Sequence, residues 1–190
     1  MRDIVLASQS EARKNLLRQI GLRFRVVTPR VREDRSLKGR CSDLVVRNAL
    51  KKARDVARGL SSGVVISADT VVRVGRTLIG KPRNIEDAFK TLKALSRKPQ
   101  WVYTGIAVID IDHRKTLTAH EKTKVCMRPL SDTQIMNYFK KVSPLDKAGS
   151  FDIQGLGALF IDRIEGCYYN VVGLPLARLA VLLEKVGVTI

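Results

Sequence analysis

An acidic residue, Asp69, directly follows an apolar run near the middle of the chain. Val64, Val65 and Ile66 come after Gly63 and are β-branched, which is typical of a buried strand. We therefore expect Asp69 at or near the end of a central strand, where ligands gather in open α/β sheets. An ionised carboxylate there needs a cation, a metal or a hydrogen-bond donor. The alternative is an aspartate that only caps a turn, which is a common role of this residue.

A serine-containing turn near the beginning of the chain is a candidate anion site. Residues 3–7 predict a first strand, and Ser10 is a good N-cap for a helix over residues 11–20. The start of a helix presents free backbone N–H groups to an anion. Ser8 adds a hydroxyl donor, and Arg13 adds a guanidinium fork that suits phosphate oxygens.

Two charged residues of the next segments are further candidates. Glu33 lies in a basic loop over residues 29–40, where it is either a site residue or a solvated loop residue. Lys52 belongs to a helix that we expect from residue 43 to about residue 59, with Ser42 as its cap. Most lysines and arginines of this helix lie off its apolar stripe, which favours a solvated face.

The second half of the chain supplies three more polar candidates. Lys81 stands between Gly80 and Pro82, and this combination restricts its backbone position. Lys147 and Gln154 lie in a loop that is rich in glycine and small residues. A glutamine amide can recognise the edge of a base.

The remaining pattern predicts a mixed α/β sheet flanked by helices on both faces, in a single domain over residues 1–190. Further strands are expected at 24–27, 71–74, 77–79, 100–111, 117–127 and 159–164, and further helices at 85–95, 132–141 and from Pro175 onward. Several cations and a few carboxylates at strand ends and helix starts are what a metal–polyphosphate site needs. The cations would neutralise phosphate oxygens, and the acids would hold a divalent metal.

Composition narrows the possible partners. The net charge is +17, of which +10 falls in residues 1–60, and this excess indicates anionic partners or a generally basic proteome. The three cysteines form no CxxC pair and the two histidines form no helical zinc pair, so oxygen ligands and Mg²⁺ or Mn²⁺ are favoured. No apolar run is long enough for a membrane span, and no secretory signal is evident, so we expect a cytoplasmic protein.

Short blocks along nearly the whole chain resemble the Maf family of nucleoside triphosphate pyrophosphatases. The blocks are LASQSEARKNLL at the beginning, Glu33 in its loop, ALKKA around Lys52, SADTVV around Asp69, IGKP around Lys81, VYTG at 102–105, KAGSFDIQG at 147–155 and NVVGLP at 170–175. Their order along the chain is the order of the family, which is more specific than any single block.

The resemblance implies two lobes around a central cleft and hydrolysis of nucleoside triphosphates, including dTTP, UTP and modified nucleotides, to monophosphate and pyrophosphate with a divalent metal. A homodimer is also implied. Asp69 resembles the family's proton acceptor, and Glu33 resembles its acidic partner near the metal. The phosphate-binding set would be Ser8, Ser10, Arg13, Lys52 and Lys81, with Lys147 as a further substrate ligand, and base choice would involve Thr70 and Gln154.

One block departs from the family pattern. The family usually reads SxSPRR, whereas this chain reads SQSEAR, with Ala12 at a position that is linked to substrate choice. Since alanine offers no hydrogen bond, we expect a broader base preference. Two other readings stay open, a basic nucleic-acid-binding module and a regulator of cell division without hydrolase activity. The few aromatic residues are dispersed, so at most weak, non-specific nucleic-acid binding is expected.

Overall fold

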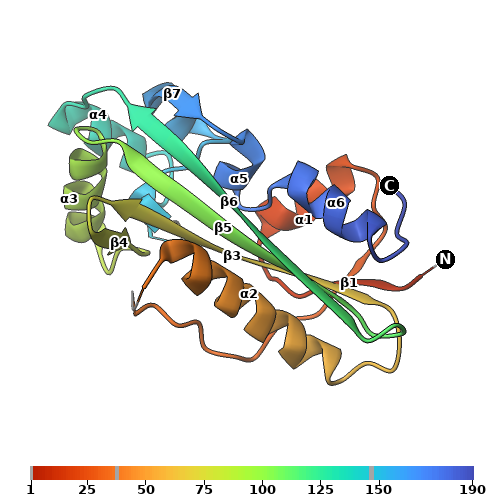
Figure 1. The fold of residues 1–190 in the computed structure, drawn as a ribbon. Coiled ribbons are helices and arrows are strands. Elements are labelled where there is room, and N and C mark those ends of the chain that lie inside the picture. Colours follow the sequence, from red (N-terminus) through yellow and green to blue (C-terminus); the bar gives the residue numbers. More distant parts are fainter. Residues whose placement is uncertain (1, 37–38, 146–147) are drawn as a thin grey trace. The chain divides into compact units, whose positions relative to one another are not determined.

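The computed structural model describes residues 2–36, 39–145 and 148–190 (Figure 1). The chain divides into two compact units, each assembled from separate stretches of sequence. The first unit contains Met1–Thr70, Tyr103–Glu121 and Tyr169–Ile190, and the second contains Val71–Val102 and Lys122–Tyr168. The single domain expected over residues 1–190 stays a prediction.

The first unit contains a mixed sheet in the order β2-β1-β3-β5-β6. Its short strands are β1 (Ile4–Leu6) and β2 (Arg25–Val26), and the long ones are β3 (Val64–Val74), β5 (Gln100–Asp110) and β6 (Lys115–Met127), which continue into the second unit. β1 pairs in parallel with both neighbours, and Leu6 lies opposite Ile66 of β3. This register determines how far β3 extends past the end of β1.

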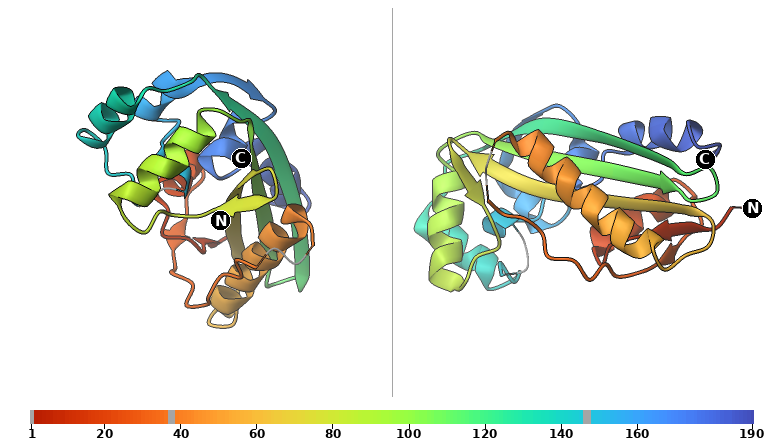
Figure 2. Two further views of the ribbon diagram at one scale, coloured as in Figure 1. Left: turned by 90° about the vertical axis from the view of Figure 1, so that its left-hand side faces the viewer. Right: turned by 60° about the horizontal axis from the view of Figure 1, so that its bottom comes forward.

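Alternate side chains of these strands enter two hydrophobic cores, because successive residues of a strand point to opposite faces. Ile4, Leu6 and Ile66 pack with leucines of α1 (Glu11–Gln19) and α6 (Leu176–Glu184). Val5 and Val65 pack instead with the apolar side of α2 (Cys41–Ala57). Figure 1 shows α1 and α6 together, and the right-hand view of Figure 2 shows α2 lying along the strands. The predicted helices on both faces of a mixed sheet are therefore confirmed.

The helix starts of the first unit test the predicted caps. The Ser10 side chain accepts a hydrogen bond from the Arg13 backbone N–H, which confirms it as the cap of α1. The cap predicted at Ser42 is wrong, because α2 already begins at Cys41 and Arg40 occupies the N-cap position. Cys41 is buried, and the Ser42 hydroxyl donates to Asp43 Oδ1 at 3.3 Å. Pro175 is the N-cap of α6 rather than a first-turn residue.

The second unit has its own core, formed mainly by α3 (Ile85–Leu95), α4 (Asp132–Phe139) and the segments that pack on them. β4 (Thr77–Ile79) pairs with β3, and β7 (Ile161–Glu165) pairs with β6, both antiparallel. Asn84 caps α3, and Ser131 forms a capping box with α4. Two 3₁₀ turns, η1 (Ala148–Ser150) and η2 (Leu156–Phe160), precede β7. The strand predicted from residue 159 therefore begins two residues later.

Two smaller features complete the fold. A short helix that the sequence pattern did not predict, α5 (Tyr168–Val172), precedes α6. The three cysteines are free thiols, of which Cys41 is buried and Cys126 and Cys167 are half-buried. In the described part of the chain, none of the helices combines the length and the apolar character that crossing a bilayer requires.

Candidate functional site

Asp69 lies within β3 and not at its end, so this part of the sequence prediction is wrong. Residues 71–74 continue the strand and pair with β4, which extends the β-structure past the carboxylate. β1, however, stops at Leu6, opposite Ile66. Asp69 therefore stands three residues past the last paired position of β1.

A buried lysine links the two predicted acids. The Lys52 ammonium lies 2.6 Å from Glu33 Oε1 and 2.7 Å from Asp69 Oδ1, and it also donates to the Ala68 carbonyl at 3.3 Å. Lys52 is only 7 % exposed and Asp69 only 4 %. Three acceptors match the three protons of an ammonium, so the buried charge is fully hydrogen-bonded. Lys52 therefore does not lie on the solvated face that the charge run of its helix favours.

Asn48 holds the other oxygen of Asp69 and is the main site residue that the sequence analysis missed. Its amide nitrogen donates to Asp69 Oδ2 at 2.9 Å and to the Asp34 carbonyl at 2.8 Å. Its amide oxygen accepts the Asp34 N–H at 2.9 Å. One buried amide therefore orients the carboxylate of β3 and fastens the loop that carries Glu33 to α2.

A sequence signal for Asn48 does exist. Buried residues of α2 recur at positions 44, 45, 48, 49, 52, 53 and 56, which is the spacing of one helix face. Asn48 and Lys52 are the polar members of this stripe and stand one turn apart. Because a polar side chain on an apolar stripe must find partners inside the protein, such a pair indicates a site.

Glu33 titrates under opposing influences. Burial raises the pKa of its carboxyl, but the hydrogen bond and charge of Lys52, helped by Arg35 and Arg13, outweigh burial and lower the pKa overall. Glu33 is therefore ionised at neutral pH. With Asp69 it forms a pair of carboxylates on either side of a single ammonium.

Arg13 is the centre of a second group, on the opposite face of β3. Its guanidinium donates to the Gly173 carbonyl at 2.9 Å, to Ser8 Oγ at 3.3 Å and to Thr70 Oγ1 at 3.0 Å. Ser8 Oγ also accepts the Ser10 N–H at 3.2 Å. Burial lowers the pKa of Arg13, and the negative charges of Asp69 and Glu33 oppose this shift. Two guanidinium N–H groups are left over from these bonds, enough for a phosphate oxygen.

The hydroxyl of Thr70 is committed to a chain of hydrogen bonds. Buried Thr104 donates its single proton to the Asn170 carbonyl at 3.1 Å, so its oxygen accepts from Thr70 at 2.9 Å. Thr70 in turn accepts from Arg13. The order of the chain is therefore fixed, and the Thr70 proton points into the protein. Thr104 was not among the predicted residues, although the VYTG block contains it.

The other predicted residues are distributed as follows. Ala12 lies half-buried in the first turn of α1. Lys81 and Gln154 are exposed residues of the second unit, where the Gly80 carbonyl accepts a hydrogen bond from the Gly149 N–H at 3.4 Å. Lys147 lies outside the described residues. The structure thus gathers Ser8, Ser10, Arg13, Glu33, Lys52, Asp69 and Thr70 in the first unit.

Comparison with solved structures concerns the fold. The chain is similar to the Staphylococcus aureus Ham1 protein, with a TM-score of 0.54 over 97% of this chain and 99% of that one. The two sequences are only 17% identical, so this likeness supports the predicted architecture alone.

Comparison with sequences is more specific. A dTTP/UTP pyrophosphatase of Dictyoglomus turgidum is 45% identical over 98% of this chain and 97% of its own. A dTTP/UTP pyrophosphatase of Methanosarcina barkeri is 46% identical over 100% of this chain and 97% of its own. The family model for Maf-like proteins matches residues 3–186. This chain therefore belongs to the family of Maf-like proteins.

Proposed function

We propose that this protein is a nucleoside triphosphate pyrophosphatase that hydrolyses dTTP and UTP to the monophosphate and pyrophosphate. The observation that carries the proposal is the pairing of Glu33 and Asp69 with buried Lys52, beside Asn48. The names of two relatives at about 45% identity supply the substrates. Hydrolysis of these compounds removes them from the nucleotide pool, which fits a house-cleaning role.

Asp69 is the proposed proton acceptor. Each of its oxygens has one described partner, Lys52 or Asn48, and a carboxylate offers about four lone-pair sites. Acceptor capacity therefore remains for a water molecule. Lys52 and Asn48 fix the carboxylate in place, so that the water which it activates attacks from a defined direction.

The phosphate chain is assigned to the group around Arg13. Ser8, Ser10 and the start of α1 supply neutral donors, and Arg13 supplies the positive charge. Lys81, Lys147 and Gln154 keep the roles that the family resemblance gives them. Substituting each of these three residues separately tests those roles.

A divalent metal, Mg²⁺ or Mn²⁺, is proposed as the cofactor, with Glu33 and Asp69 as its protein ligands. Among the described residues, three or more acidic, histidine or cysteine side chains do not gather in one place. Two carboxylates still fit, because Mg²⁺ is commonly held by one or two carboxylates together with water and substrate phosphates. When bound, the metal would neutralise charge on the phosphate oxygens.

Product analysis tests the reaction. Purified protein is incubated with dTTP, UTP, CTP, GTP and modified nucleotides in the presence of Mg²⁺ or Mn²⁺. Cleavage between the α- and β-phosphates yields monophosphate and pyrophosphate. Diphosphate and orthophosphate as main products would contradict the proposal, as would turnover that is unaffected by removal of divalent metal.

Substrate choice is the finer part of the proposal. Ala12 replaces the arginine of the SxSPRR pattern, and a charged hydrogen bond is worth about 1.5–3 kcal/mol. We therefore expect CTP and GTP to be accepted alongside dTTP and UTP. The ratios of kcat/KM should sharpen in Ala12→Arg. Sharp selectivity in the wild type with unchanged ratios in the variant would show that this position does not control base choice.

We also propose that the protein acts as a homodimer in the cytoplasm, as the family resemblance implies. Light scattering coupled to gel filtration measures the mass in solution. A mass equal to the 21.2 kDa of a single chain at working concentrations would contradict the dimer.

A further inference from the structure

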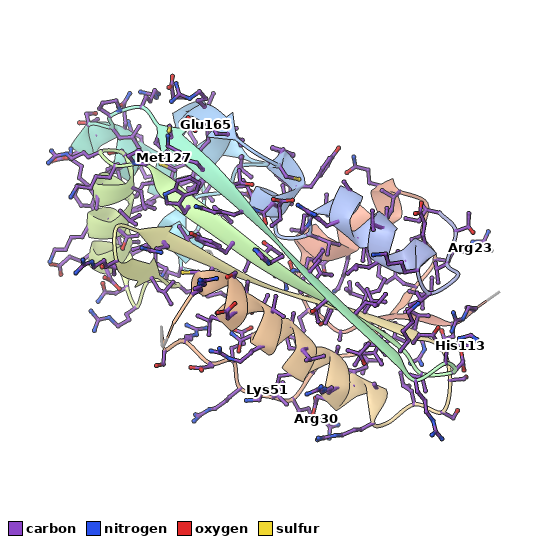
Figure 3. All side chains as sticks on the ribbon, viewed as in Figure 1. Arg23, Arg30, Lys51, His113, Met127 and Glu165 are labelled. Atoms are coloured by element: carbon purple, nitrogen blue, oxygen red, sulfur yellow. The ribbon has the colours of Figure 1, made fainter. Side chains whose placement is uncertain are left out.

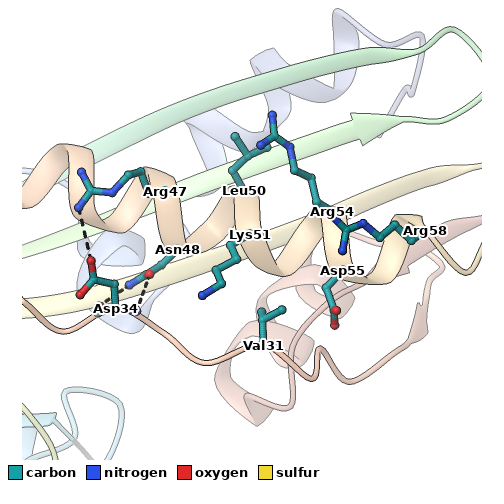
Figure 4. A pocket seen from close by; sticks show the side chains of 9 residues that line it. All are labelled: Val31, Asp34, Arg47, Asn48, Leu50, Lys51, Arg54, Asp55 and Arg58. Carbon is teal, nitrogen blue, oxygen red and sulfur yellow. Dashed lines mark hydrogen bonds and ion pairs between the residues drawn. The ribbon is translucent and has the colours of Figure 1, made fainter.

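A groove runs along the side of α2 that carries its charged residues (Figure 4). Its volume is about 510 Å³, which lies within the roughly 300–1,000 Å³ of small-molecule sites. One wall is α2, and the other is the extended loop that carries Val31 and Asp34. Among the lining residues, Asn48 is the one shared with the catalytic cluster.

Four cations follow the groove along the helix. Arg47, Lys51, Arg54 and Arg58 are separated by four, three and four residues, which places them on one stripe about 16 Å long. All four are exposed, and Figure 3 shows Lys51 and Arg30 on the outer side of α2. Lys51 also donates to the Arg32 carbonyl at 2.8 Å. The loop and the cationic stripe are therefore joined.

Two carboxylates share the groove, and both are already engaged. Asp55 accepts the Arg30 N–H at 2.7 Å. Asp34 accepts the Ser36 N–H at 2.8 Å and lies 3.8 Å from Arg47. These acids fasten the loop to the helix, and the positive charges still outnumber them. With four cations and two acids among its lining residues, the groove keeps a net positive charge.

The groove and the catalytic cluster are separate faces of one helix. Lys51 and Lys52 are consecutive, so their side chains diverge by about 100° around the axis, and Lys52 faces Asp69. Asn48 forms the partition, since it lines the groove while its amide is occupied by Asp34 and Asp69. A ligand can therefore occupy the groove without entering the cluster.

The residues that line the groove suit phosphate groups better than a nucleotide base. Among the residues lining the described groove, Val31 and Leu50 are the apolar ones and aromatic side chains do not occur. Stacking of a base requires an aromatic platform, whereas a row of arginines and lysines matches a row of phosphates. We propose that the groove of α2 is a second anion site, which binds a linear chain of phosphates outside the catalytic cluster.

Site-resolved NMR tests this inference without requiring turnover, so it can fail or succeed independently of the proposed activity. Inorganic tripolyphosphate is titrated into ¹⁵N-labelled protein at about 150 mM salt, where diffuse surface attraction is largely screened. The amides of Lys51, Arg54 and Arg58 should shift and saturate together. In the double variant Arg54→Gln/Arg58→Gln the apparent Kd for these shifts should rise at least about tenfold, since two charged contacts are lost.

The double variant Arg97→Gln/Lys98→Gln is the control. It removes the same charge from exposed positions of the second unit and should leave the Kd at the groove within about twofold. A parallel titration with a non-hydrolysable nucleoside triphosphate distinguishes the two sources of a phosphate chain. Groove amides that respond to either compound support the site. Amides that respond to neither compound, or that respond equally in both double variants, overturn it.

Discussion

At the scale of single residues, the arrangement of Lys52 between two carboxylates decides what the site can do. A buried ammonium is stable only when its protons meet acceptors, and here two carboxylates and the Ala68 carbonyl meet all three. The same contacts lower the pKa of Glu33 and hold both carboxylates in place. The site is therefore assembled before substrate arrives, and the energetic cost of orienting its charges is met during folding.

Replacing the proposed proton acceptor tests this arrangement. Asp69→Asn is near-isosteric and should lower kcat by about 10²- to 10⁴-fold, because loss of a general base has effects of this size. Steady-state kinetics on protein whose thermal unfolding is cooperative provides the measurement. The exposed Asp162→Asn is the control and should stay within about twofold of wild type. Turnover of Asp69→Asn within threefold of wild type would show that Asp69 is not the proton acceptor.

Glu33 provides a direct readout of Lys52. Burial raises the pKa of Glu33, and Lys52 is the main group that lowers it, so the pKa should rise in Lys52→Gln. Carbon-13 NMR of the Glu33 carboxyl follows this titration. In the wild type, the stabilising effect of this lowered pKa is present above the unfolded-state pKa and is lost as pH falls through the folded-state pKa. An unchanged Glu33 titration would show that the contact with Lys52 is absent in solution.

At the scale of elements, the close approach of α2 to β5 positions Asn48 and Lys52. Gly105 permits this approach, because a Cβ there would lie 2.4 Å from the Val45 carbonyl carbon and 2.5 Å from its oxygen. Backbone atoms cannot rotate aside as a side chain does. The glycine at the end of the VYTG block therefore has a packing role within the first unit.

Gly105→Ala should lower the free energy of unfolding by about 1–3 kcal/mol, the usual cost of overpacking, and should impair catalysis by displacing α2. Urea denaturation measures the first effect. Gly59→Ala is the matched control, since its Cβ would meet the Val56 carbonyl at an ordinary 3.8 Å, and it should change stability by less than about 0.5 kcal/mol. Equal stability of the two variants would refute the close contact.

The turn between β5 and β6 contains an acid-sensitive contact. Asp110 is buried, which raises its pKa, but hydrogen bonds from Arg2 and His113 outweigh burial and lower the pKa from 3.8 to about 2. A lowered pKa stabilises the fold above about pH 4, and this contribution is lost as pH falls through about 2. The shift corresponds to about 2 kcal/mol.

Asp110→Asn should therefore be about 2 kcal/mol less stable than wild type at pH 7. At pH 3 this difference in stability should be about half as large. Urea unfolding at both pH values measures the difference. Asp162→Asn again serves as the control. A difference that is the same at pH 3 and pH 7 would show that Asp110 does not titrate with a lowered pKa.

At the scale of the whole molecule, the net charge of +17 exceeds what one triphosphate requires. A charge of this size attracts nucleic acid through counterion release, which depends steeply on salt. We expect weak, sequence-independent binding of DNA and RNA at low salt that disappears near physiological salt. Fluorescence anisotropy with oligonucleotides of different sequence follows it. Sequence-specific binding that persists at physiological salt would favour the alternative of a nucleic-acid module.

The sequence by itself determined the elements whose signals are local. The cap at Ser10 is confirmed, because a capping side chain bonds to backbone within its own first turn. The family was also predictable and is confirmed, because its short blocks preserve residue types in order along residues 3–186. The mixed α/β fold followed from the alternation of strand and helix signals, and it too is confirmed.

Only the tertiary structure decided which polar residues become buried partners. Lys52 reads as solvated in a helix full of cations, yet it is buried because Asp69 and Glu33 converge on it from β3 and a distant loop. Asn48 and Thr104 belong to the site for the same reason, because their hydrogen-bond partners Asp69 and Thr70 lie 21 and 34 residues away in the sequence. The sequence predicts a strand end near Asp69 because the residue directly follows an apolar run. Whether a strand continues depends on pairing with other strands, and here β1 stops while β3 runs on.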